Sequence, residues 1–238
     1  MSNIEIWTGA ASPNLELPKS IGYKFKTDGS AEYFDANTII CHVDQTSELY
    51  VKLLEIREEL INLPFANKFA FMPPESYHMT LFVGCNDRVR TREEWSNLFG
   101  LDASIDEITD AFITRLSGVK GIPSSFIMKP EAISANNSGC VTLMLEPADE
   151  EQSKILSKSR DILSDKTGIR RLDHEHYKYH ITFSYQIDWL TSDEAAHLDT
   201  LLKKLFDNHF NKNSEICISK AQLCRLFSMN KFDPTLTL

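Results

Sequence analysis

The chain has 238 residues, of which 42% are hydrophobic and 25% charged, and its formal net charge is −9. This composition is typical of a globular protein and excludes collagen-like and low-complexity classes. No apolar run approaches the roughly 18 residues that a membrane helix needs, and the negative charge disfavours coating of long nucleic acid duplexes or membrane surfaces. A small anionic ligand held in one site is compatible with this charge.

The N-terminal segment and the cysteines indicate the compartment. Residues 1–19 lack a basic stretch leading into an apolar core, so they predict an irregular arm and not a secretory signal. The five cysteines are scattered and contain no C-x-x-C pair, which indicates reduced thiols and not a disulfide framework or a zinc finger. We therefore expect a cytoplasmic protein that forms a single domain over residues 1–238.

The first half of the chain predicts strands and helices in alternation. Short apolar or alternating runs bounded by turn residues predict strands, whereas apolar residues spaced by three and four predict helices. Strands are expected over 38–43 and 77–83, the last ended by Gly84, and a strand or hairpin is expected over 22–29, with Asp28 and Gly29 as its turn signal. Helices are expected over 46–63 and after the capping-box patterns that begin at Thr91 and Ser104.

The second half predicts a similar mixture. Strands are expected over 125–134, 140–146, 176–187 and 216–227, followed by a polar tail. One helix is expected to have Pro147 as its first residue and to end at Gly168, and another begins at the capping box of Thr191. Strands that cluster around turns, with helices unevenly interspersed, predict an α+β fold with largely antiparallel sheets.

One rare pattern occurs twice in the chain. It reads His78-Met79-Thr80-Leu81-Phe82 and, 102 positions later, His180-Ile181-Thr182-Phe183-Ser184. The same gapless shift superposes the apolar segment 40–43 on 142–145, together with apolar pairs of the helix that follows each. We interpret this as an internal repeat. It predicts two similar lobes, over residues 20–117 and 124–230, related by a pseudo-twofold axis.

The repeated motif suits proton transfer at a phosphate. Its histidine and threonine lie two residues apart, so both side chains point to one face of a strand. Two such pairs facing one another would place two imidazoles and two hydroxyls around one point. One imidazole can accept a proton while the other donates one, and the hydroxyls can hold non-bridging oxygens, without a metal or a cofactor. The candidate catalytic residues are His78, Thr80, His180 and Thr182.

At these residues the sequence resembles the two-histidine (2H) phosphoesterase superfamily, which includes the RNA 2′,3′-cyclic phosphodiesterases once called RNA ligases. The signature of this superfamily is a pair of H-x-[TS]-hydrophobic motifs about a hundred residues apart. The stretches 22–29, 73–80 and 173–182 are similar to a poorly characterised microbial branch of it. The resemblance implies a bilobal fold in which antiparallel sheets line a central cleft and helices lie outside.

The resemblance also implies an activity, the hydrolytic opening of a cyclic or 2′-linked nucleotide phosphodiester. The substrate would be a small nucleotide or an RNA end. One motif histidine would activate water and the other would protonate the leaving ribose oxygen, while Thr80 and Thr182 would bind the phosphate. As a working assignment, His78 is the acid and His180 the base.

Other side chains are weaker candidates for substrate binding. Tyr77 and Phe82 could stack on a base, Arg170 could clamp a phosphate, and Lys178 shares the face of His180. Each has a competing structural role, because aromatic strand residues mostly pack in cores and an arginine after a helix also serves the helix dipole. The remaining local basic candidates are Lys24, Lys26 and Arg171.

Two alternative interpretations stay open. His174, His176 and His180, with Asp173 and Glu175, could bind zinc or nickel, but on a straight strand these histidines would spread over about 20 Å and could reach one ion only across a bend. We therefore predict no metal site. The same cleft could instead bind a nucleotide without turnover, as a non-catalytic module, although two proton-transfer groups favour an enzyme.

Overall fold

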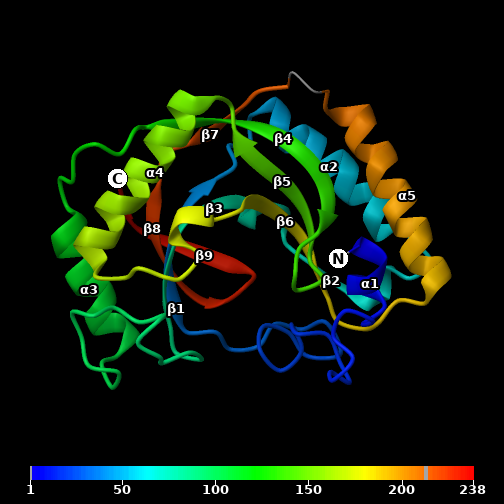
Figure 1. Ribbon diagram of the computed structural model, residues 1–238, viewed down its shortest axis with the longest axis horizontal. Helices are drawn as coiled ribbons and strands as arrows, with labels where there is room; N and C mark the ends of the chain where they lie inside the picture. The colour runs from blue at the N-terminus through cyan, green and yellow to red at the C-terminus, as the bar shows by residue number, and fades with distance from the viewer. Residues whose placement is uncertain (1, 212–213) are drawn as a thin grey trace.

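The computed structural model describes residues 2–211 and 214–238, and these residues form a curled sheet flanked by helices (Figure 1). The strands are β1 (Ala36–His42), β2 (Phe69–Phe71), β3 (His78–Asn86), β4 (Ser125–Ala135), β5 (Val141–Pro147), β6 (Tyr179–Gln186), β7 (Ile216–Ser219), β8 (Gln222–Ser228) and β9 (Lys231–Thr237). The α-helices are α1 (Asn3–Trp7), α2 (Glu48–Ile61), α3 (Ile105–Leu116), α4 (Glu150–Thr167) and α5 (Ser192–His209). The α+β class is therefore confirmed.

The nine strands form one sheet in the order β7-β4-β5-β6-β3-β1-β8-β9, with β2 added beside β6. The pairs between these strands are antiparallel. Four strands of this order lie on each side of the β6–β3 junction, and the inner ones are counterparts in the repeat, since β5 flanks β6 as β1 flanks β3. The two expected sheets are thus halves of one continuous sheet that curls around the site.

The internal repeat is reproduced in the hydrogen-bond register of the sheet. Cys41 of β1 pairs with Met79 of β3, and Leu143 of β5 pairs with Ile181 of β6. Both members of the second pair lie 102 positions after those of the first. The helices α2 and α4, which connect these strands, occupy corresponding places in the repeat. This confirms the expected pseudo-twofold relation.

The two halves interleave along the chain. The strands β8 and β9 follow β6 in sequence, yet β8 pairs with β1 in the other half of the sheet. The division at residues 117–124 therefore separates the repeated motifs but not the two halves of the sheet. Residues 220–221 break the expected strand over 216–227 into β7 and β8, and the expected polar tail forms β9.

Several helix boundaries agree with the sequence, because the capping residues act as predicted. Ser104 and Thr191 make complete capping boxes at α3 and α5. Gly168 ends α4 with a left-handed conformation, at a φ of 67°. The start of α4 was wrongly placed, because Pro147 ends β5 and Asp149 caps the helix by accepting from the backbone N–H of Gln152.

Three other expectations are wrong for local reasons. Thr91 begins only a turn, because the Glu94 carboxylate that would complete its capping box pairs with Arg171. The segment 22–29 forms no continuous strand, because the carbonyl of Ser20 accepts from three successive N–H groups, at 23, 24 and 25, and folds the chain into a tight loop. The turn expected at Asp28 and Gly29 does form, and one antiparallel bridge between Phe25 and Ala31 spans it. The first 19 residues are not wholly irregular, since α1 buries Trp7 completely.

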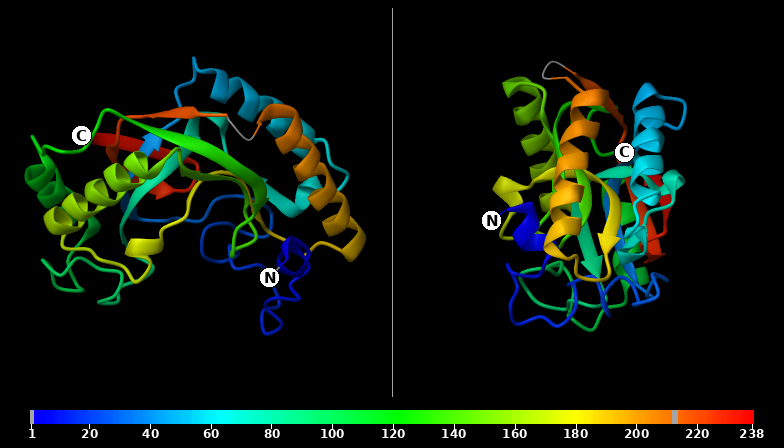
Figure 2. Two further views of the ribbon diagram at one scale, coloured as in Figure 1. Left: turned by 45° about the horizontal axis from the view of Figure 1, so that its top comes forward. Right: turned by 90° about the vertical axis from the view of Figure 1, so that its right-hand side faces the viewer.

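The segment between α1 and β1 crosses the open side of the arch formed by the sheet. In Figures 1 and 2 this blue segment runs along the lower side of the molecule, below the strands. Phe25 anchors it, with 1% of the side chain exposed.

In the described part of the chain, no helix is long and apolar enough to cross a membrane.

Candidate active site

A cavity of about 500 Å³ lies on the face of β3 and β6 that carries both H-x-T motifs. His78, Thr80, His180 and Thr182 all line it, and each is half-buried. Between them along the two strands, Met79 and Ile181 point to the other face and are completely buried. The structure therefore brings together the four residues that the repeat predicts as catalytic.

The pairing of β3 with β6 fixes how the two motifs meet. Met79 pairs directly with Ile181, and an antiparallel register through this pair sets His78 beside Thr182 and Thr80 beside His180. Residues opposite one another in such a pair have Cβ atoms about 5 Å apart. In this register each motif histidine is opposite the threonine of the other motif, and all four side chains line one cavity.

Both histidine rings are oriented by the same contact. Nδ1 of His78 lies 2.6 Å from the carbonyl oxygen of Ser76, and Nδ1 of His180 lies 2.9 Å from that of Lys178. A carbonyl only accepts, so each Nδ1 donates its hydrogen, and the Nε2 of a neutral ring keeps a free lone pair. In both motifs the acceptor is the carbonyl two residues before the histidine, and the geometry therefore repeats with the sequence.

The cavity keeps both imidazoles neutral when it holds no anion. Loss of hydration lowers the pKa of His78 to about 4, and the charges of nearby basic groups act in the same direction. The pKa of His180 is lowered for the same main reason, burial. A phosphate between the rings would reverse these effects, since an anion favours the protonated imidazole.

Each motif threonine has a tyrosine partner that the sequence analysis did not include. Thr80 neighbours the phenol of Tyr177, and Thr182 that of Tyr185, so that each threonine acts to lower the pKa of its tyrosine. Both tyrosines line the cavity. Burial raises the pKa of Tyr177 to about 12, so its phenol stays protonated and can donate to a hydroxyl or a phosphate.

A bulge explains why Tyr185 reaches the cavity, although strict alternation along the strand would place it on the face opposite to Thr182. In β6 the partner of Val141 is Ser184 but the partner of the next residue, Thr142, is Thr182, so one residue is extra. The alternation of faces breaks there, and Tyr185 joins Thr182 on the cavity side. The corresponding position of β3 has the same irregularity, between residues 80 and 82.

The four weaker candidates do not line the cavity. Tyr77 and Phe82 are core residues, with 2% and 3% of their side chains exposed. Lys178 is exposed, and its carbonyl, not its ammonium, serves the site by orienting His180. Arg170 is exposed and ion-paired outside the cavity. Among the basic candidates, Lys24 and Arg171 are the ones that reach it.

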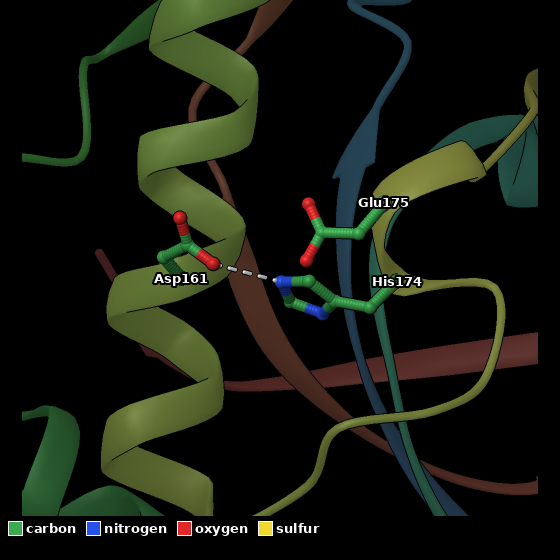
Figure 3. A group of neighbouring side chains, drawn as sticks. All are labelled: Asp161, His174 and Glu175. Atoms are coloured by element: carbon green, nitrogen blue, oxygen red, sulfur yellow. Dashed lines mark hydrogen bonds and ion pairs between the residues drawn. The ribbon is translucent and has the colours of Figure 1, made fainter.

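The histidines considered as metal ligands are separated by the structure. Residues 174–176 form a 3₁₀ turn, whereas His180 lies in the cavity. Among the described residues, the one group with the spacing for a metal ion is Asp161, His174 and Glu175 (Figure 3). Arg170 pairs with both carboxylates of this group, at 3.1 Å from Asp161. The Arg170 guanidinium therefore supplies the positive charge that a metal ion would supply there. We interpret the group as a structural ion-pair network.

The C-terminal hairpin supplies an aromatic wall to the cavity. The ring of Phe232, in β9, lies 4.2 Å from the ring of His78 between centroids. Leu226 and Met229 from the same hairpin also line the cavity. Sequence reasoning missed this wall by treating the segment as a tail, although the alternation of Phe232 and Leu236 with polar residues is a weak strand signal.

Comparisons with known proteins agree with this geometry. Residues 24–139 match a family model named 2H-phosphodiest and described as a domain of unknown function, DUF1868. The crystal structure of LigT from E. coli has the same fold, with a TM-score of 0.52, 10% identity, and coverage of 87% of this chain and 98% of that chain. The family model and the shared fold support membership of the 2H phosphoesterase superfamily.

A second solved structure is similar over the whole length. It is a conserved protein of unknown function from Agrobacterium tumefaciens strain C58, with a TM-score of 0.90, 25% identity, and coverage of 100% of this chain and 99% of that chain. A search of the curated proteins found no match. Membership of the 2H superfamily indicates a phosphoesterase-type function for this chain.

Proposed function

We propose that this 2H phosphoesterase is a metal-independent phosphodiesterase that opens a cyclic or 2′-linked nucleotide phosphodiester by general acid and base catalysis. The observation that carries the proposal is the convergence of both H-x-T motifs on one cavity, with each Nδ1 held by a backbone carbonyl. Two free Nε2 atoms on opposite sides of one point are what an in-line displacement at phosphorus requires.

The proposed reaction balances with these groups alone. The Nε2 of one histidine takes a proton from water as the water oxygen bonds to phosphorus. The bond from phosphorus to the leaving ribose oxygen breaks, and the Nε2 of the other histidine gives this oxygen a proton. One ring ends protonated and the other neutral, and exchange with solvent restores both.

The surroundings of the two histidines support the assignment of His78 as the acid and His180 as the base. Phe232 packs on His78, so the aromatic wall offers a stacking surface for the leaving nucleoside beside this ring. The hydrogen bond that orients His180 is exposed, so we assign the activation of water to this ring. The bound phosphate monoanion would raise the pKa of His78 and so supply the proton that the leaving oxygen needs.

The hydroxyls and the size of the cavity support a small substrate. Thr80 and Thr182 line the cavity beside the two histidines, where their hydroxyls can donate to the two non-bridging oxygens. A volume of about 500 Å³ accommodates a mononucleotide or the end of an oligonucleotide. All five cysteines are unpaired, which favours a reducing compartment, so we propose that the enzyme acts in the cytoplasm.

The test is turnover of 2′,3′-cyclic nucleotides and 2′–5′-linked oligonucleotides without added metal. We expect hydrolysis by the wild type and a loss of about 10²–10⁴-fold in kcat for both His78→Ala and His180→Ala. His176→Ala, an exposed histidine outside the cavity, is the matched control and should keep full activity. Binding of these nucleotides with no turnover would instead support the non-catalytic module, and inactivation by a chelator would contradict the metal-independent mechanism.

A further inference from the structure

The charged side chains of the cavity are not balanced. Besides the histidines, Lys19, Lys24, Glu94 and Arg171 line it. Arg171 is neutralised, since one Nη lies 2.5 Å from the Glu94 carboxylate and the other donates to the carbonyl of Gly84. Lys19 is exposed and donates to a backbone carbonyl. Lys24 is half-buried, and no carboxylate of the described residues lies within 4.0 Å of its ammonium.

Aromatic groups and one hydroxyl surround the Lys24 ammonium. Its Nζ lies 3.3 Å from the Tyr185 hydroxyl oxygen, 4.7 Å from the Tyr185 ring centroid and 5.9 Å from that of Phe34. Tyr185 and Thr182 both line the cavity, and Thr182 acts on the pKa of the Tyr185 phenol. The ammonium therefore contacts a side chain that neighbours a motif threonine. Ring faces attract a cation, but they neutralise no charge.

The charge of Lys24 reaches both imidazoles. Burial is the main cause of the lowered pKa of His78 and of His180, and the charge of Lys24 adds to it in both cases. One ammonium that affects both rings, and that also adjoins Thr182, lies close to the point that the four motif groups surround. In a chain of net charge −9, such an unneutralised cation at the centre of a cavity is suited to an anion.

We infer that Lys24 is a catalytic residue whose ammonium binds a non-bridging oxygen of the phosphodiester held between His78 and His180. This inference rests on the proposed function. A phosphodiester carries one negative charge, and attack by water that has lost its proton to a histidine adds a second charge at the transition state. An ammonium in a partly dehydrated site stabilises the second charge more than the first, so Lys24 accelerates the reaction and keeps its own proton throughout.

Lys24 lies outside the internal repeat. The residue 102 positions later is Phe126, which is completely buried in β4. The duplicated halves therefore supply the acid, the base and both hydroxyls, whereas the segment that crosses the open side of the sheet supplies the positive charge. Lys24 therefore has no counterpart in the repeat, and the repeated motifs of the sequence do not include it.

Steady-state kinetics of charge variants test the inference. We expect Lys24→Met, which keeps the length of the side chain, to lose about 10²–10³-fold in kcat with a smaller change in KM, and Lys24→Arg to recover part of the loss. Lys26→Met removes an exposed lysine from the same loop, outside the cavity, and should leave both constants unchanged. Unchanged kcat in Lys24→Met, with an unchanged melting temperature, would overturn the inference.

Two further measurements do not depend on turnover. Inorganic phosphate should bind Lys24→Met more weakly than the wild type or Lys26→Met in calorimetry. In NMR titrations without ligand, the imidazoles of His78 and His180 should have higher pKa values in Lys24→Met than in the wild type, and Lys26→Met should not differ from the wild type. The other titratable groups near these side chains are His42, Tyr23, Tyr185 and Cys140. If the wild type turns over no substrate, the proposed function fails, whereas equal phosphate affinities and equal titrations would overturn the role of Lys24.

Discussion

Met79 and Ile181 pair directly across the β3–β6 junction, and they are also counterparts in the 102-residue repeat. Two residues that face one another and are also counterparts in the repeat lie on either side of the local twofold axis. The axis therefore passes between the side chains of Met79 and Ile181. The motif histidines and threonines flank them on the cavity face. Duplication of one imidazole–hydroxyl pair thereby places two such pairs on one cavity, which is the arrangement that the proposed acid and base catalysis requires.

The surroundings break this symmetry, and the choice of leaving group can reveal the roles of the two histidines. A nitrophenyl ester of a nucleotide has a weakly basic leaving oxygen that departs without a proton. If His78 is the acid, His78→Ala should lose about ten-fold or less on such an ester, against about 10²–10⁴-fold on a cyclic nucleotide. His180→Ala, which removes the base, should lose a similar factor on both.

The comparison is made from kcat of both variants on both substrates. The wild type on each substrate is the reference, and His176→Ala again controls for the loss of an exposed imidazole. The opposite pattern, with His180→Ala insensitive on the nitrophenyl ester, would exchange the two roles. Equal losses for both variants on both substrates would contradict a separate acid and base.

The sequence was informative wherever one local pattern decided the structure. The spacing of the two H-x-T motifs predicted the candidate site and the repeat, because a gapless shift preserves strand register. The sequence could not place the side chain of Tyr185, because a single extra residue in β6 changes which face of the strand this side chain occupies. It could not place β8 and β9 either, since the choice between two sheet edges depends on contacts remote in sequence.

Packing of Phe232 on His78 should control the titration of this imidazole. Phe232→Leu shortens the side chain and admits water to the ring, so the pKa of His78 should rise from about 4 towards the ordinary value of 6.5. NMR titration of the ligand-free protein measures this directly. Phe227→Leu, on the same hairpin with 48% of the side chain exposed, is the control. An unchanged His78 titration in Phe232→Leu would show that the aromatic wall does not dehydrate the ring.

The lowered pKa of His78 also predicts how stability depends on pH. The unfolded chain binds a proton at His78 near pH 6.5, whereas the folded protein resists protonation until about pH 4. The unfolded state therefore binds more protons in this window, and the free energy of unfolding falls as the pH falls, by about 3 kcal/mol from this one group.

Urea unfolding between pH 7 and pH 4 measures this dependence. His78→Gln should unfold with a shallower pH dependence, since the titrating group is gone. His176→Gln, which removes an exposed histidine, should keep the wild-type slope. A slope in His78→Gln equal to that of the wild type would contradict the burial of a neutral imidazole at this position.

Gly84 is required by the close approach of β1 and β3 at the edge of the cavity. A Cβ at this position would lie 2.1 Å from Oδ1 of Asn37 and 2.4 Å from its carbonyl oxygen. The Asn37 side chain is held on both sides, because Oδ1 accepts from the N–H of Cys85 and the amide donates to Thr109. The strand therefore continues through Gly84, where the sequence predicted its end, and any side chain there must push the two strands apart.

We expect Gly84→Ala to destabilise the protein by about 3 kcal/mol or more, seen as a lower melting temperature. Activity should fall as well, because Arg171 donates to the carbonyl of Gly84 and would shift with it. Gly118→Ala is the matched control, since its Cβ would meet nothing within 4 Å and only the positive φ, of 69°, adds strain of about 1 kcal/mol. Equal melting temperatures for the two variants would show that β1 and β3 can separate at Gly84 without cost.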